Sequence, residues 1–219
     1  RRHLALTVGV LAVIWVSGSL LLWPRKPVGT VRVAAVGWVH ATLPGGKGTP
    51  SARVWLETYV PLLDAAVKKG AKLVVSPETG FFVQPWERDP FLKQVSRAAK
   101  KRGVMLAVGW FDYRDKKNRI TFVDPAGKVV AGYEKTHLIM TLEKYNPGDG
   151  TLAVSTLVGK WKLGGMICQD DNFTDLSRGY GRKKAHLLAV PTNDWKQVAP
   201  YHLENSLFRA VESRYAIVR

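Results

Sequence analysis

The stretch GGMICQD at residues 164–170 places the only cysteine of the chain directly after a short apolar run. Leu163–Ile167 has the length and composition of a buried strand, so we expect Cys168 at a strand end. A single thiol forms no internal disulfide and cannot supply a zinc site built from several cysteines. Because a lone cysteine is often a small core residue, the surroundings of Cys168 decide its interpretation.

Two charged side chains follow predicted strands in the same way. The run Lys72–Ser76 predicts a strand with Glu78 just past its end, and Lys128–Tyr133 predicts one with Lys135 just past its end. Functional side chains of α/β proteins gather at strand ends, where loops converge over a rigid scaffold. We therefore expect the carboxylate, the ammonium and the Cys168 thiol to meet at a common point.

A carboxylate, an ammonium and a thiol at one point can catalyse acyl transfer. The thiolate is the nucleophile, and a nearby cation is expected to lower the pKa of Cys168. Glu78 can accept the thiol proton as general base and later activate the second substrate. Lys135 can stabilise the oxyanion together with the backbone N–H of Gln169. Taken singly, each of these residues is also common as a surface charge or a core side chain.

The rest of the chain alternates predicted strands and helices, which indicates an α/β domain. Further strands are predicted at Val31–Trp38, Val104–Phe111 and His186–Val190, and the strand Arg119–Val123 forms a predicted hairpin with Lys128–Tyr133. Helices are predicted at Ser51–Lys69 with a kink at Pro61, from an N-cap at Asp89 to Gly103, and from about Pro200 to Val218, so that the chain stops inside a helix.

The N-terminal segment predicts a membrane helix. Leu4 to Trp23 contains no charged residue, and basic residues flank it on both sides. A helix of this length at ~1.5 Å per residue spans roughly the ~30 Å hydrocarbon core of a bilayer. The apolar region of a signal peptide is shorter and ends at a small-residue cleavage site. Residues 1–27 therefore predict a retained transmembrane helix at about 4–23 with a short linker, and the flanking charges leave its orientation open.

Composition favours a membrane partner over a nucleic acid. Thirty-three Lys and Arg against 17 Asp and Glu give a formal net charge of +16, which attracts acidic lipid headgroups or phosphate backbones. The eight tryptophans are scattered, without an aromatic nucleic-acid motif. The five histidines are scattered as well, so neither a metal nor another cofactor is expected. The chain also lacks a serine-hydrolase elbow and a Walker A sequence, and its oligomeric state is open.

Three local sequences carry a resemblance to a known family. VVSPET at 74–79, GYEKTHL at 132–138 and GGMICQD at 164–170 resemble, in this order, the Glu, Lys and Cys motifs of the nitrilase (carbon–nitrogen hydrolase) superfamily. TNDW at 192–195 is similar to the stretch after the next strand of that family, and the helix with His202 resembles its next helix. The resemblance covers about residues 31–219.

This resemblance implies a four-layer α-β-β-α sandwich over residues 28–219. It also implies Glu78 as general base, Lys135 as oxyanion stabiliser and Cys168 as nucleophile. A second glutamate is common in the family shortly after the lysine, and Glu143 stands at that place.

Within the superfamily the chain is most similar to the apolipoprotein N-acyltransferase branch. The catalytic domain of that branch follows membrane helices and lies outside the cytoplasm, at the inner or plasma membrane. The resemblance implies that Cys168 takes a fatty acyl group from a phospholipid as a thioester, which the N-terminal amine of a lipoprotein then accepts. Asn193, Asp194 and Trp195 become candidates for the substrate pocket.

Two departures leave other interpretations open. Gln169 and Asp170 replace the aromatic residue and glutamate that usually follow the nucleophile in that branch. The chain has one apolar span and stops before the last strands of the family, which indicates a fragment truncated at its C-terminus or a reduced relative. The same three residues would serve a membrane-tethered amidase or nitrilase-type hydrolase of small amides. A basic interaction domain at a membrane, with a degenerate site, is the third interpretation.

Overall fold

The computed structural model describes residues 2–22, 29–38, 50–157 and 159–219, in two units, Arg1–Val31 and Arg32–Arg219. The first unit holds helix α1 (Arg2–Leu22). Among the described residues, α1 is the one helix long and apolar enough to cross a membrane, judged by length and composition alone. The predicted helix is therefore confirmed and its membrane crossing stays a prediction. The predicted linker lies outside the described residues.

The second unit contains two mixed sheets. The first has the strand order β1-β2-β4-β5-β6, with β3 also paired to β4, and the second has the order β10-β9-β8-β7. The strands are β1 (Val33–Ala35), β2 (Leu73–Val75), β3 (Phe81–Val83), β4 (Met105–Asp112), β5 (Lys117–Val123), β6 (Val129–Glu134), β7 (Val154–Leu157), β8 (Trp161–Gly165), β9 (Leu187–Ala189) and β10 (Ala216–Val218). The predicted hairpin is confirmed by the antiparallel pairing of β5 with β6.

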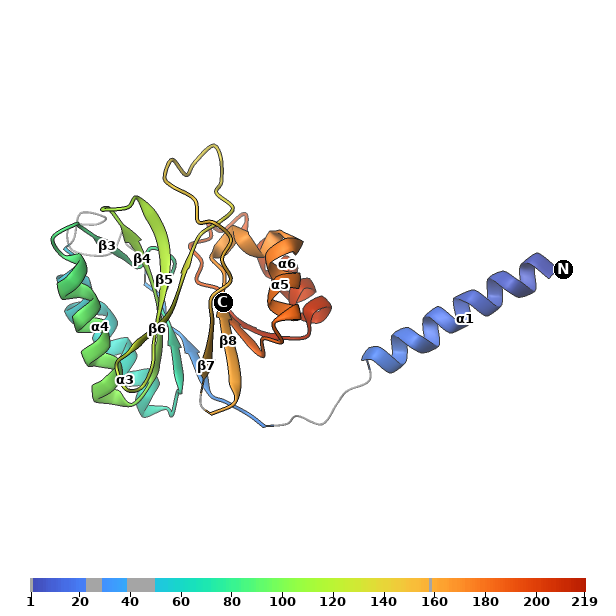
Figure 1. Ribbon diagram of the computed structural model, residues 1–219, viewed down its shortest axis with the longest axis horizontal. Coiled ribbons are helices and arrows are strands. Elements are labelled where there is room, and N and C mark those ends of the chain that lie inside the picture. The colour runs from blue at the N-terminus through green and yellow to red at the C-terminus, as the bar shows by residue number, and fades with distance from the viewer. Residues whose placement is uncertain (1, 23–28, 39–49, 158) are drawn as a thin grey trace. The chain divides into compact units, whose positions relative to one another are not determined.

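Helices cover the outer faces of both sheets, which gives the expected layer order α-β-β-α (Figure 1). The first sheet carries α3 and α4, and the second carries α5 and α6. The helical segments are α2 (Ser51–Val54), the π-helical turn η3 (Trp55–Tyr59), α3 (Val60–Lys68), α4 (Arg88–Arg102), the 3₁₀ helix η4 (Cys168–Asn172), α5 (Thr174–Arg182) and α6 (Ala199–Ser213).

The two sheets pack face to face next to the cysteine loop. Gly165, the last residue of β8, faces the first sheet so closely that a Cβ there would lie 2.6 Å from the ring of Phe122 and 3.2 Å from Ile120. Its neighbour Gly164 faces the other way, toward Tyr180 of α5. Because successive residues of a strand point to opposite faces, the end of β8 packs against the first sheet through one glycine and against α5 through the other. The pair of glycines in GGMICQD is thus explained by packing.

The C-terminal segment differs from the expectation of one helix to Val218. Helix α6 ends at Ser213, Arg214 adopts a left-handed conformation with φ of 59°, and Ala216–Val218 forms strand β10 parallel to β9. The helical spacing of apolar residues runs on to Tyr215, but pairing with β9 gives the residues that follow hydrogen-bond partners that no local pattern records. The chain therefore ends beyond a strand rather than inside a helix.

Two helix predictions also change in detail. The predicted helix Ser51–Lys69 contains a π-helical turn just before Pro61, where the missing proline N–H breaks the regular hydrogen-bond ladder. The N-cap of α4 is Glu87 instead of Asp89, and the Glu87 carboxylate accepts the N–H of Gln84 at 3.0 Å. The predicted end at Gly103 is confirmed.

Candidate active site

Glu78 lies between two short strands that both pair with β4 of the first sheet. Strand β2 pairs with the first half of β4 and β3 with its last residues, and residues 76–80 between them carry Glu78. Gly109 of β4 faces this loop, and its N–H donates to Ser76 Oγ at 2.8 Å. A Cβ at Gly109 would lie 2.2 Å from the carbonyl oxygen of Pro77. The close approach of β4 therefore fixes the backbone that presents the buried Glu78 side chain.

Lys135 follows β6, and its fully buried side chain lies between two carboxylates. Its Nζ donates to Glu78 Oε1 at 2.8 Å and to Glu143 Oε1 at 2.6 Å. Burial alone would lower the pKa of an ammonium, but the charge of Glu78 and the hydrogen bond to Glu143 outweigh it and raise the pKa of Lys135. Lys135 is therefore a permanent cation at neutral pH.

Further polar groups hold this ion pair in place. Glu143 Oε2 accepts the N–H of Ile139 at 2.7 Å, which ties the following loop to the carboxylate that binds Lys135. Asn118 of β5 donates through Nδ2 to Glu78 Oε1 at 2.8 Å and to the Tyr145 hydroxyl at 3.2 Å. Sequence analysis missed Asn118 and Tyr145, because Asn118 lies 40 residues from Glu78 and no local motif relates them.

Cys168 begins the 3₁₀ helix η4 in a strained backbone conformation. Its φ is 48°, in the left-handed region that non-glycine residues rarely adopt. Its N–H donates to the carbonyl oxygen of Pro191 at 2.9 Å, which anchors the turn to the chain beyond β9. Strain of this kind clusters at functional sites, where the surrounding structure holds it.

The thiol of Cys168 is neutral in the resting protein. Burial raises its pKa, the charges of Glu78 and Asp194 raise it further, and the Lys135 ammonium only partly opposes them. The Lys135 cation lowers the pKa of Cys168 as expected, but burial and the charges of Glu78 and Asp194 outweigh it, so the net shift is upward. To act as a nucleophile, Cys168 would need a base to accept its proton.

A cavity of about 540 Å³ joins the predicted site residues. Glu78, Glu143 and Cys168 line it together with Asn193 and Trp195, two of the three expected substrate-pocket residues. The rest of its wall is mostly apolar or aromatic and includes Phe82, Phe111, Tyr113, Ile139, Leu142 and Tyr145. The structure thus brings five of the predicted residues, from four segments of the chain, to one cavity.

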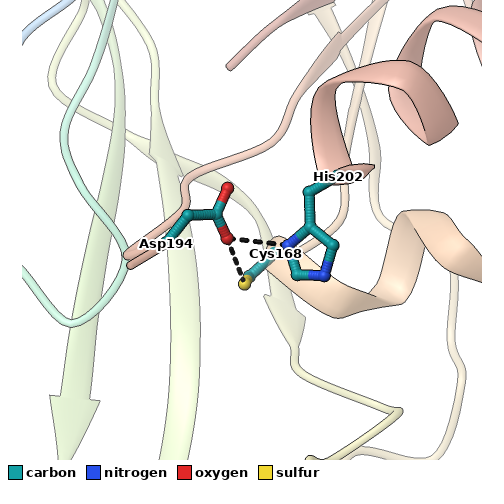
Figure 2. Close-up of side chains that lie close together, drawn as sticks. All are labelled: Cys168, Asp194 and His202. Atoms are coloured by element: carbon teal, nitrogen blue, oxygen red, sulfur yellow. Dashed lines mark hydrogen bonds and ion pairs between the residues drawn. The ribbon is translucent and has the colours of Figure 1, made fainter. Parts of the chain in front are cut away.

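Asp194 does not line this cavity but lies against Cys168 in a separate network (Figure 2). The Cys168 thiol donates to Asp194 Oδ1 at 3.4 Å, and His202 Nδ1 lies 2.7 Å from the same oxygen. Arg219 Nη2 donates to Asp194 Oδ2 at 2.8 Å. Burial works to raise the pKa of Asp194, but its bonds to Arg219 and His202 bring the pKa below its usual value. Asp194 is therefore ionised at neutral pH.

Asp170 ties the lysine loop to the cysteine loop. Its fully buried carboxylate accepts the Tyr133 hydroxyl at 2.8 Å, the N–H of Thr136 at 3.2 Å and the N–H of His137 at 2.7 Å. It also accepts the N–H of Ile167 at 3.2 Å. Asp170, which stands where the acyltransferase branch usually has glutamate, is therefore held by four hydrogen bonds within the fold.

Gln169 lies between Cys168 and Asp170 in the sequence. Its side-chain Nε2 is 3.4 Å from the carbonyl oxygen of Leu138. Because the N–H of Cys168 is bonded to Pro191, the next amide along the chain, that of Gln169, stays our predicted donor to an oxyanion.

Two mixed sheets between helix layers, with a buried cysteine, lysine and glutamate around one cavity, define an α/β protein of the nitrilase type. The sequence model of the family described as carbon-nitrogen hydrolase matches residues 32–218, and the chain belongs to this family. Among solved structures, the NitN amidase of Nesterenkonia sp. AN1 superposes with a TM-score of 0.68 at 22% identity, over 86% of this chain and 78% of that one. Nit3 of Saccharomyces cerevisiae gives 0.63 at 23%, over 77% and 69%.

Curated relatives include two kinds of enzyme. Deaminated glutathione amidase of Mus musculus is 28% identical over 199 residues, which cover 78% of this chain and 61% of the relative. Apolipoprotein N-acyltransferase of Geobacter metallireducens is 32% identical over 138 residues, which cover 59% of this chain and 26% of the relative. The chain thus spans about three fifths or less of these relatives. Membership of the family supports a cysteine-dependent C–N hydrolase or transferase.

Proposed function

We propose that this protein is a membrane-anchored acyltransferase that moves a fatty acyl group from a phospholipid to the N-terminal amine of a lipoprotein through a Cys168 thioester. The observation that carries the proposal is the apolar surface at the cavity. Leu142 and Trp195 line the cavity and are 65% and 48% exposed, and Met140, between two lining residues, is 91% exposed. Exposed apolar side chains grouped at a site favour a lipid or another apolar ligand.

Two further features support a membrane setting. Helix α1 has the length and composition of a membrane anchor, and the net charge of +16 favours a surface of acidic headgroups. The acyltransferase relative also belongs to the same family as this chain. We place the catalytic unit, residues 28–219, outside the cytoplasm at the inner or plasma membrane.

The first half-reaction acylates Cys168. The thiol sulfur attacks the ester carbonyl carbon of the phospholipid while Glu78 accepts the thiol proton. The Lys135 ammonium, held by Glu143, and the N–H of Gln169 stabilise the oxyanion. The intermediate collapses to the thioester, and the lysophospholipid oxygen leaves with the proton from Glu78.

The second half-reaction passes the acyl group to an amine. The amine nitrogen attacks the thioester carbonyl carbon and gives a proton to Glu78. Collapse of the second intermediate forms the amide, and the Cys168 sulfur leaves and regains its proton from Glu78. Because Lys135 is a permanent cation, it stabilises both oxyanions without exchanging a proton.

A hydrolytic reaction on small amides is the alternative function. It is supported by the amidase relatives, which match 78% of this chain, beside acyltransferase relatives that match 59% and 90%. The same residues would act, with water attacking the thioester after an amine or ammonia has left. The two functions differ in the second substrate, an amine or water, and in whether the cavity excludes water from the thioester.

Substitution of one rim residue separates the two functions. We expect Leu142→Ser to lower the acylation rate with phospholipid vesicles severalfold, because a polar side chain replaces apolar contact area, about 1–2 kcal/mol of transfer free energy. Its hydrolysis of a small amide should not change. Leu56→Ser, on the equally exposed Leu56 of η3, is the matched control and should alter neither rate.

The readouts are the mass of an acceptor peptide with a free N-terminal amine and the release of ammonia from the amide. Acyl transfer to the peptide that falls in Leu142→Ser supports the acyltransferase. Ammonia release without any acyl transfer, unaffected by Leu142→Ser, would replace it with the amidase.

A further inference from the structure

Cys168, Asp194 and His202 form a cluster whose ligand types the proposed reaction does not require together. The thiol sulfur, the carboxylate oxygen Oδ1 and a ring nitrogen of His202 all lie within 4.8 Å of one another. Cys168 and His202 are buried, and Asp194 is mostly so. Figure 2 shows the three side chains, from the η4 turn, the segment after β9 and helix α6, converging on one point.

These three groups match the ligand preferences of a borderline-soft divalent cation. Thiolate, imidazole and carboxylate are the protein ligands of Zn²⁺, at about 2.3 Å for sulfur and about 2.0–2.2 Å for nitrogen and oxygen. In a tetrahedral site such bonds separate the ligand atoms by about 3.3–3.5 Å. The observed separations from Asp194 Oδ1 are 3.4 Å to Cys168 Sγ and 2.7 Å to His202 Nδ1. The contact between Asp194 Oδ1 and His202 Nδ1 must therefore widen for an ion to enter the cluster.

The second oxygen of Asp194 is already held in the manner of a metal-ligating carboxylate. Arg219 Nη2 donates to Oδ2 at 2.8 Å, which leaves Oδ1 directed at Cys168 and His202. Outer hydrogen bonds of this kind fix the orientation of ligands and are a regular part of metal sites. A thiolate and one carboxylate would balance the two charges of the cation.

We propose that Cys168, Asp194 and His202 bind one Zn²⁺ ion, which reversibly blocks the nucleophile. Binding replaces the thiol proton with a sulfur–zinc bond and releases that proton to solvent. The sulfur electron pair then bonds to the metal and cannot attack a carbonyl carbon. The blocking role rests on the proposed function of Cys168, whereas ion binding by itself does not. This site corrects the expectation of no metal, which rested on the scattered histidines and the single cysteine. Asp194 is 26 residues from Cys168, so no local ligand spacing marks the pair.

Cobalt provides a test that does not depend on activity. The full chain is titrated with Co²⁺ to follow the thiolate-to-metal absorption band, and Zn²⁺ is then added in competition, with Mg²⁺ as the hard-ion control. We expect one Zn²⁺ per chain and no effect of Mg²⁺. Cys168→Ser and His202→Gln should each weaken Zn²⁺ binding by at least about 100-fold. His186→Gln, on an exposed histidine outside the cluster, is the matched control and should bind as the native protein does.

A charge-transfer band that disappears in Cys168→Ser and survives in His186→Gln supports the site. If His202→Gln does not fold, as judged by circular dichroism, the near-isosteric Asp194→Asn replaces it with the same expected loss. Absence of saturable Zn²⁺ binding in the native chain, or binding that Cys168→Ser leaves unchanged, overturns the proposal.

The same samples separate this inference from the proposed function. With the native chain, Zn²⁺ should suppress acylation of Cys168, and a chelator should restore it. Metal binding at Cys168 in a protein that forms no thioester with any substrate would refute the function and leave the site. Thioester formation that saturating Zn²⁺ does not suppress would refute the blocking role.

Discussion

The two sides of Cys168 are built from different groups. On the cavity side, the Lys135 cation lies between the carboxylates of Glu78 and Glu143. On the closed side, the Asp194 carboxylate lies between His202 and Arg219. Glu78 and Glu143 line the cavity and Asp194 does not. We infer that the first side carries the chemistry and that the second holds the thiol, so substitutions on the two sides should have effects of different size.

The largest effect is expected from Lys135→Met on the cavity side. The substitution leaves the buried carboxylate of Glu78 and the partly buried one of Glu143 without their cation, which we expect to destabilise the fold by about 3–5 kcal/mol. Loss of the oxyanion partner should lower the acylation rate by a further factor of about 100 to 1,000. Thermal unfolding and single-turnover acylation measure the two effects.

The control for Lys135→Met is Lys144→Met, at an exposed lysine next to Glu143. It should change neither quantity. Native-like acylation by a folded Lys135→Met would remove Lys135 from the mechanism.

A smaller effect should follow from displacing Glu78 without altering its charge. In Gly109→Ala the new Cβ would lie 2.2 Å from the Pro77 carbonyl oxygen, so the loop that presents Glu78 must move. We expect a loss of about 1–3 kcal/mol in unfolding free energy and a clear fall in acylation rate. Gly132→Ala, where the Cβ would meet nothing nearer than 3.6 Å, should behave as the native protein. Equal behaviour of the two variants would contradict the close approach at β4.

On the closed side, Asp194→Asn should have a modest effect on catalysis. It weakens one hydrogen bond to the thiol, worth about 1 kcal/mol, which corresponds to about a fivefold loss of acylation rate. The single-turnover acylation rates of Asp194→Asn and Lys135→Met, measured side by side, give this comparison. A loss as large as that of Lys135→Met would mean that Asp194 takes part in the proton transfers, and the contrast between the two sides would fail.

The smallest effect is expected at His137, which contacts Asp170, and it is an effect on stability that depends on pH. The hydrogen bond to Asp170 raises the pKa of His137, and the charges of Asp170 and Asp175 add to it against partial burial. A raised pKa means that protonated His137 stabilises the fold fully below its unfolded pKa of ~6.5 and that this contribution is lost as pH rises through the folded pKa. His137→Gln should therefore lower unfolding free energy more at pH 5 than at pH 9.

Because the side chain is partly exposed, screening keeps this difference small. Urea unfolding at the two pH values measures it, with His186→Gln as control. A destabilisation that is equal at both values would show that the charge of His137 contributes nothing.

The same contrast explains what could be predicted from the sequence. Glu78, Lys135 and Cys168 each follow an apolar strand run inside a recognisable motif, so their approach to one cavity was accessible from local patterns. Residues such as Asn118 and Arg219 reach the site through strand pairing and through β10, which replaces the predicted end of a helix. Such long-range pairing leaves no periodic signal in the chain. The neutral state of the thiol also required the actual burial and the position of Asp194.

The central claim is that Cys168 becomes acylated with Glu78 as its base. The most direct test is the intact mass of the chain after incubation with phospholipid vesicles and a small amide, followed by acid quenching. We expect an acyl mass increment that hydroxylamine removes, that is absent in Cys168→Ala and that is strongly reduced in Glu78→Gln. An unchanged mass of the native chain, or an increment that persists in Cys168→Ala, would contradict it.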